Sequence, residues 1–143
     1  MDSDTARFAL ALVTGMADAV IYADAQGMVR FWNSGAERIF GFGQAEAVGQ
    51  SLDIIVPPNL RQRHWDGFYE TMRTGHSHYA SGALLAVPAI RKDGSRISVE
   101  FTILPFRDDA ERLVGIAAVM RDVTERFEEM KALRKAAAMA ART

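Results

Sequence analysis

Apolar and polar residues alternate along the segment 96–103, within a predicted strand at 95–104. The apolar set, found at every second position, is Ile97, Val99, Phe101 and Ile103. A period of two places alternate side chains on opposite faces of a β-strand, so the segment predicts a strand with one buried face. Strand-like segments at 78–90 and 112–120 flank it, and turn residues separate the three. The second half of the chain is therefore predicted to be a three-stranded antiparallel meander.

The first half of the chain predicts a β-hairpin followed by helices. Residues 19–23 and 28–32 have the composition of paired strands joined by a tight turn. Asn33 is a good N-cap for a helix over 34–40, which Gly41 can end.

Two short helical segments, at 44–48 and 51–55, are predicted next. A longer helix is predicted from about residue 59 to 72, ending at Gly75. Outside these elements, Ser3 and Asp4 can cap an N-terminal helix.

The longer helix carries one histidine on its apolar face. Leu60, His64 and Phe68 recur every four residues and share that face, while charged residues occupy the opposite one. A histidine in this position is either a packed core residue or an axial ligand of haem iron, which requires a neutral imidazole on a rigid element in an apolar pocket. Periodicity alone leaves both interpretations open.

Composition excludes several classes of function. The chain has 143 residues, a net charge of −1 and 49% apolar residues, which indicates one globular domain without a nucleic-acid or membrane surface. It contains no apolar run long enough to span a bilayer and no signal-peptide pattern, so a cytoplasmic location is expected. The lack of cysteine excludes thiol catalysis, thiolate metal sites and a cysteinyl–flavin adduct.

The order of predicted elements and four short motifs resemble the PAS domain family. The motifs span residues 33–41, 49–52, 91–95 and 121–126. The resemblance implies an α+β PAS fold, with a five-stranded antiparallel sheet, helices on one face, and flanking helices at both ends. It divides the chain into an N-terminal flanking helix (1–16), a sensor core (17–122) and a C-terminal signalling or dimerisation helix (123–143).

Residues 56–66 are similar to the haem-binding, FixL-type branch of the family. The resemblance implies that His64 is the proximal ligand of a b-type haem and that His78 lies near a propionate. It places Phe101 and Ile103 over the distal face, with Tyr79 near the same face. A sensor of this type binds a diatomic gas, carbon monoxide, nitric oxide or dioxygen, or responds to redox state.

The sequence departs from that branch at the distal side. Leu84 and Leu85 occupy the region where the oxygen sensors carry an arginine that donates to bound dioxygen, and leucine cannot donate. Glu70 stands where a basic residue would meet a propionate, and residues 81–83 lack the methionine that is the sixth ligand in related sensors. Carbon monoxide and nitric oxide are therefore expected to bind readily, while dioxygen needs Tyr79 or a water as donor.

Other candidate sites are weaker. His64, His76 and His78 could form a three-histidine metal site, but no carboxylate or cysteine supports it, so solvated loop histidines are expected. Trp32 and Trp65 are expected to pack in the core. No catalytic grouping is visible, and no enzyme activity is expected from these residues.

Two alternatives to a haem sensor remain. One is a haem-free PAS module that dimerises, contacts another protein or binds an apolar small ligand. The other is a flavin-binding redox PAS. In each case a homodimer is expected, because Met130, Leu133, Ala137 and Ala140 have heptad spacing in the C-terminal helix. An output domain or partner protein, unidentified from these residues, would receive the signal.

Overall fold

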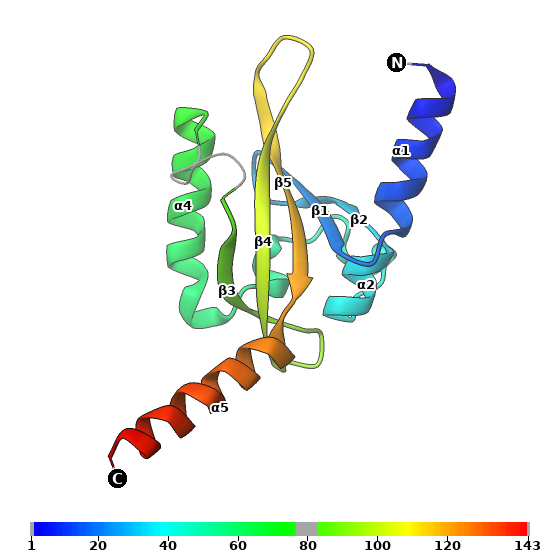
Figure 1. Cartoon of the computed structure of the whole chain (residues 1–143). Coiled ribbons are helices and arrows are strands. Elements are labelled where there is room, and N and C mark those ends of the chain that lie inside the picture. Colours follow the sequence, from blue (N-terminus) through cyan, green and yellow to red (C-terminus); the bar gives the residue numbers. More distant parts are fainter. Residues whose placement is uncertain (1, 77–82, 143) are drawn as a thin grey trace.

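A five-stranded antiparallel sheet forms the centre of the protein (Figure 1). The computed structural model describes residues 2–76 and 83–142. In chain order, the elements are α1 (Ser3–Gly15), β1 (Ala19–Asp24), β2 (Val29–Trp32), α2 (Ser34–Phe40), α3 (Gln44–Ala47), η1 (Leu52–Ile55), η2 (Pro58–Leu60), α4 (Arg61–Thr74), β3 (Leu85–Ile90), β4 (Arg96–Arg107), β5 (Leu113–Asp122) and α5 (Thr124–Ala141). The predicted PAS fold, with its flanking helices, is confirmed.

The strand order is β2-β1-β5-β4-β3, so the first and last strands of the chain pair at the centre of the sheet. Their register runs from Ala19 opposite Met120 to Asp24 opposite Gly115. The hairpin and the meander are local pairings, and this one long-range pairing joins them into a single sheet.

The hydrophobic core lies between the sheet and the helices that follow the hairpin. Strand residues such as Ile21, Trp32 and Val99 meet Phe40 of α2 and Phe68 of α4 in one buried cluster. The alternation along β4 is confirmed where the strand crosses this core, because Ile97 and Val99 are buried while Ser98 and Glu100 are only half-buried.

Asn33 joins three elements at one corner of the sheet. Its side-chain oxygen accepts from the amides of Ala36 and Val20 at 2.9 and 2.8 Å, and its side-chain nitrogen donates to the carbonyls of Val13 and Asp18 at 2.8 and 3.0 Å. The predicted N-cap is therefore confirmed, and the same amide also fixes α1 and β1 relative to α2.

The two flanking helices contribute nothing to the core. Neither α1 nor α5 has a buried residue, and α5 projects away from the sheet (Figure 1). Met130 and Leu133 of α5 are 45% and 63% exposed. Both helices are thus held mainly by their junctions with the core.

Several predicted boundaries differ from the structure. The carboxylate of Asp2 accepts from the amide of Thr5 and caps α1, in place of the predicted Ser3 and Asp4. Strands β4 and β5 extend past the predicted ends at residues 104 and 120. Pro105 is tolerated within β4 because β3 pairs only as far as Phe101, which leaves one side of this part of β4 without a partner strand.

Candidate functional site

The predicted apolar face of α4 is present. Phe68 is 7% exposed, and Leu60 packs against the core cluster. His64, four residues from each of them in the sequence, is half-buried. Pro58 starts the short helix that leads into α4, and Gly75 ends α4 with a left-handed φ of +76°. Both ends follow from residue type, since proline fixes φ at a first helical position and glycine adopts positive φ without strain.

Aromatic rings surround the imidazole of His64. The ring of Trp65 meets it edge to face with centroids 4.7 Å apart, and the ring of Phe68 lies tilted at 6.1 Å. The Nδ1 atom is buried and has no hydrogen-bond partner among residues 2–76 and 83–142. Leaving a buried polar atom unpaired costs about 1–3 kcal/mol, so a partner for this nitrogen would stabilise the protein.

Burial lowers the pKa of His64 below its usual value, because the surrounding side chains disfavour the charged imidazolium, and the negative charge of Asp53 opposes this shift. The imidazole is therefore neutral at neutral pH, with a lone pair on one ring nitrogen. A neutral imidazole is the form that binds metals.

Trp65 is held from several sides. Its indole Nε1 donates to the Asp53 carboxylate at 2.7 Å, and its ring stacks on Tyr69 with centroids 5.5 Å apart. A Cβ added to Gly27, in the β1–β2 turn, would overlap the indole. Sequence reasoning missed Asp53 and Gly27, because they lie in other elements and no periodicity connects them to α4.

The predicted distal residues occupy the β3–β4 part of the sheet. Leu85 is half-buried and pairs across the strands with Phe101, which packs against the core cluster that contains Phe68. Ile103 is also half-buried, and Leu84 is 64% exposed. His78 and Tyr79 lie outside the described residues. The structure therefore brings Leu60, Phe68 and Phe101 together around one core.

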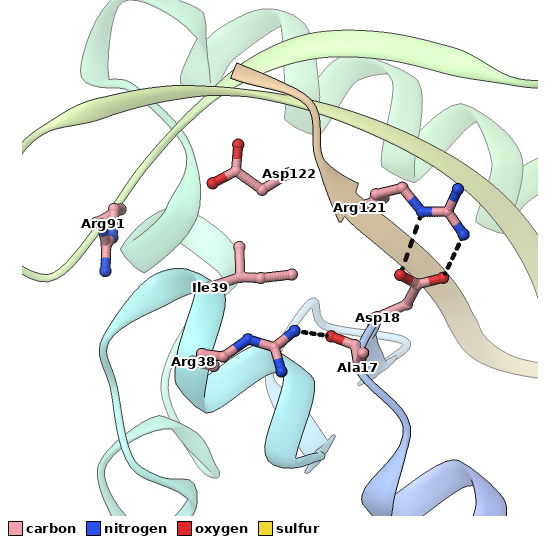
Figure 2. Close-up of a pocket in the computed structure, with 7 residues that line it drawn as sticks. All are labelled: Ala17, Asp18, Arg38, Ile39, Arg91, Arg121 and Asp122. Atoms are coloured by element: carbon pink, nitrogen blue, oxygen red, sulfur yellow. Dashed lines mark hydrogen bonds and ion pairs between the residues drawn. The ribbon is translucent and has the colours of Figure 1, made fainter. Parts of the chain in front are cut away.

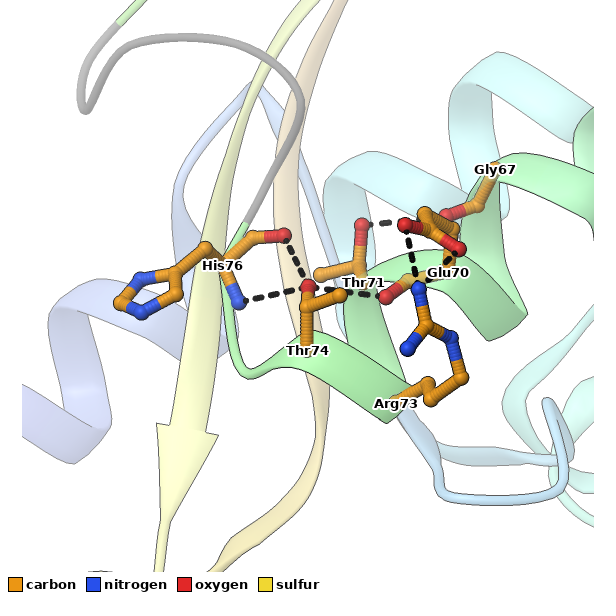
Figure 3. Close-up of polar contacts among 6 residues, drawn as sticks. All are labelled: Gly67, Glu70, Thr71, Arg73, Thr74 and His76. Atoms are coloured by element: carbon orange, nitrogen blue, oxygen red, sulfur yellow. Dashed lines mark hydrogen bonds and ion pairs between the residues drawn. The ribbon is translucent and has the colours of Figure 1, made fainter.

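The end of α4 carries polar contacts that involve His76 (Figure 3). The Thr74 hydroxyl donates to the carbonyls of Glu70 and His76 and accepts from the His76 amide, while the His76 imidazole points away from the helix (Figure 3). Arg73 donates to both carboxylate oxygens of Glu70 at 2.8 and 3.0 Å. Glu70 is thus exposed and paired with a cation on its own helix.

Within residues 2–76 and 83–142, no group of three or more histidine, cysteine or acidic side chains is arranged to hold a metal ion. No helix in the same described ranges has the length and apolar character to cross a membrane. Two surface hollows, of about 310 and 440 Å³, lie elsewhere, and neither is lined by His64.

A family model and several similar sequences place the chain in one family. The model of the PAS domain family matches residues 17–125. An uncharacterised protein of Azorhizobium caulinodans is 35% identical over 121 residues, which are 84% of this chain and 16% of that protein. The sensor protein FixL of Bradyrhizobium diazoefficiens is 31% identical over 108 residues, 76% of this chain and 21% of FixL.

The oxygen sensor protein DosP of Escherichia coli is 28% identical over 137 residues, 94% of this chain and 17% of DosP. The chain thus spans about a fifth or less of the length of these relatives.

Solved structures support the same fold. The PAS domain of a protein from Colwellia psychrerythraea superposes with a TM-score of 0.74 at 20% identity, covering 85% of this chain and 99% of that one. A light-oxygen-voltage domain studied with a flavin analogue superposes with a TM-score of 0.65 at 17% identity, covering 90% and 93%. Identities this low establish the shared architecture alone.

Proposed function

The chain belongs to the PAS domain family, and we propose that it is a sensor module that holds a b-type haem through His64 and responds to a diatomic gas or to redox state. The observation that carries the proposal is His64 itself, half-buried on the apolar face of α4 with a lowered pKa, and with no hydrogen-bond partner for its Nδ1 atom in the described part of the chain. A neutral imidazole with an unsatisfied nitrogen, held on a helix, is what haem ligation requires. The similarity to FixL and DosP supports the same assignment.

The side chains around His64 fit such a group. Leu60 and Phe68 supply an apolar surface on the same side of α4 as the imidazole, and Leu85, Phe101 and Ile103 would form the opposite apolar wall. Asp53 fixes Trp65, whose ring edge limits the rotation of the imidazole. When bound, haem would supply iron with a coordination position for carbon monoxide, nitric oxide or dioxygen.

The lack of a hydrogen-bond donor at positions 84 and 85 sets the expected preference among gases. Leucines at 84 and 85 cannot donate a hydrogen bond to a bound gas, so a polarised ligand such as dioxygen gains no stabilisation from them. We therefore expect Tyr79 or a water molecule to be the donor to bound dioxygen, and His78 to lie near a propionate.

The signal would leave through the junction of β5 with α5. The amide of Val123 donates to the Ser98 carbonyl at 2.8 Å, and the amide of Ser98 donates to the Thr124 hydroxyl at 2.9 Å. This reciprocal pair ties the start of α5 to β4, the strand that carries Phe101. We propose that residues 17–122 act as the sensor core and that a shift in β4 reorients the helix in 123–143.

A haem-free module is the second candidate. The edge-to-face contact of His64 with Trp65 favours it, because aromatic packing of this kind also stabilises a histidine with no ligand. In that case the chain would act by dimerisation, by protein contact or by binding an apolar small ligand.

One absorbance spectrum separates these candidates from each other and from a flavin domain. The full chain is expressed with a haem precursor and purified. The haem sensor predicts an intense Soret band, a flavin domain predicts a yellow protein with two bands, and the haem-free module predicts neither. A colourless protein that also fails to take up added haemin would refute the proposal.

A further inference from the structure

A charged hollow of about 310 Å³ lies at the junction between the sensor core and α5 (Figure 2). Four chain segments contribute to it: the link from α1 to β1, helix α2, the end of β3 and the end of β5. Its charged side chains are Asp18, Arg38, Arg91, Arg121 and Asp122. None of its lining residues belongs to the site around His64.

The three arginines of the hollow differ in how far they are neutralised. Arg121 donates to both carboxylate oxygens of Asp18, at 3.1 and 3.3 Å (Figure 2). Arg38 donates to the backbone carbonyl of Ala17, which carries no charge. The Nε atom of Arg91 is buried and has no hydrogen-bond partner among the described residues. Neither Arg38 nor Arg91 forms a salt bridge within the same part of the chain, although Arg91 interacts electrostatically with its neighbour Asp93.

The remaining carboxylate of the hollow is already engaged. Asp122 accepts from the amide and the hydroxyl of Thr124, at 2.9 and 2.5 Å, and so helps to start α5. Three cations thus face two carboxylates, each of which already accepts two hydrogen bonds. The residues that line the hollow carry one more positive than negative charge, an excess that Asp93 beside Arg91 and Glu100 beside Arg121 reduce. The guanidinium groups of Arg38 and Arg91, which form no salt bridge with the described residues, favour an anion.

We propose that this hollow binds a small carboxylate or phosphate anion, with Arg91 and Arg38 as the principal ligands. Guanidinium groups recognise both anions through paired N–H donors. Its volume is at the lower end of the range of small-molecule sites, which restricts the ligand to a compact metabolite. Ile39 supplies an apolar surface between the two arginines for a short hydrocarbon part (Figure 2).

The site would act on the output helix. A bound anion would connect α2 and the end of β3 to residues 121–122, directly before α5 begins at Thr124. Tying these segments together would reduce the freedom of the junction that Ser98 and Thr124 also hold. The anion is therefore a second input, which stiffens the base of α5 without contacting the core around His64.

Titration calorimetry of the full chain tests the proposal, with inorganic phosphate and propionate as probes at constant ionic strength. Arg91→Gln is the test variant, and Arg63→Gln is the matched control, because Arg63 is an exposed arginine of α4 outside the hollow. We expect saturable binding of at least one probe, a loss of affinity of at least tenfold in Arg91→Gln, and no change in Arg63→Gln. Arg91→Lys, which keeps the charge and loses the paired donors, should be intermediate.

Three results would overturn the proposal. The first is no saturable binding of either probe up to about 10 mM. The second is equal affinity in Arg91→Gln and Arg63→Gln, which would mean general charge attraction. The third result has two parts. Arg91→Gln loses both anion binding and its native circular dichroism spectrum, and Arg38→Gln folds and binds the anion as the unmodified chain does. In that last case Arg91 would have a structural role and would not be an anion ligand.

Discussion

The indole of Trp65 donates a 2.7 Å hydrogen bond to the carboxylate of Asp53, twelve residues earlier in the chain. The contact joins α4 to the 3-10 helix η1, and the same indole meets the imidazole of His64 edge to face. Asp53 thus influences His64 twice, by fixing its aromatic neighbour and by raising its pKa against the effect of burial.

Gly27→Ala should displace Trp65. A Cβ at residue 27 overlaps the indole, which cannot easily move because it is bonded to Asp53 and stacked on Tyr69. Gly94→Ala is the matched control, since Gly94 has a similar positive φ of +84° with open space around its Cβ position. We expect Gly94→Ala to lower the free energy of unfolding by about 1 kcal/mol and Gly27→Ala by about 1–3 kcal/mol more.

Urea unfolding of both variants measures the difference. Equal losses of unfolding free energy in Gly27→Ala and Gly94→Ala would show that the indole moves aside without an energetic cost. Trp65 would then not be a rigid neighbour of His64.

The haem-free protein should lose stability as the pH falls below about 6.5. The pKa of His64 is lower in the folded chain than in the unfolded chain, so the unfolded chain binds more protons in this range. The stability that the protein has at neutral pH is therefore lost as the pH falls through the pKa of His64 in the unfolded chain toward its lower pKa in the folded chain. His64→Phe should lose less stability over the same interval.

Urea unfolding at about pH 7.5 and pH 5.5 gives this comparison. His76→Gln, which replaces an exposed histidine beyond α4, is the control and should follow the unmodified chain. If His64→Phe and the unmodified chain have the same pH dependence, His64 is not buried as described.

Leu85→Arg should tighten dioxygen binding by the haem-loaded protein about ten- to a hundredfold, which corresponds to one charge-assisted hydrogen bond of about 1.5–3 kcal/mol. Leu85 is half-buried opposite Phe101, whereas Leu84 is 64% exposed, so Leu84→Arg is the control. Carbon monoxide, which is less polarised, should change little. Gas titration of the ferrous protein measures both affinities, and tight dioxygen binding without any substitution would contradict this description of the distal wall.

The C-terminal helix should mediate homodimerisation. Met130 and Leu133 are exposed in α5, at the spacing of a coiled-coil seam. Leu133→Glu should reduce the mass measured by light scattering to that of a monomer, while Lys135→Glu, off the seam, should not. An unchanged mass for Leu133→Glu and for a chain ending at Glu125 would place the dimer contact elsewhere.

Sequence reasoning predicted the local features correctly. Asn33 as an N-cap, Gly41 and Gly75 as helix ends, and the buried side of β4 at Ile97 and Val99 all depend on the chemistry of neighbouring residues. The position of His64 on the apolar face of α4 is also a local, periodic feature.

Features that depend on long-range contacts were not predictable. The bond from Trp65 to Asp53 and the close approach of Gly27 depend on how η1, α4 and the hairpin pack. The extension of β4 to Arg107 depends in part on Phe106, which packs edge to face on Tyr22 of β1. The charged hollow requires four segments distant in sequence, so the motifs that contain Arg91 and Arg121 did not indicate that these residues line one hollow.

Haem retention in His64→Ala tests the central claim most directly. The variant, the unmodified chain and His76→Ala are expressed with the same haem precursor, and the Soret absorbance per protein is measured together with the circular dichroism spectrum. We predict that His64→Ala keeps its helical signal and loses the Soret band, while His76→Ala keeps both. A Soret band of unchanged position and intensity in folded His64→Ala would contradict the assignment of His64 as the haem ligand.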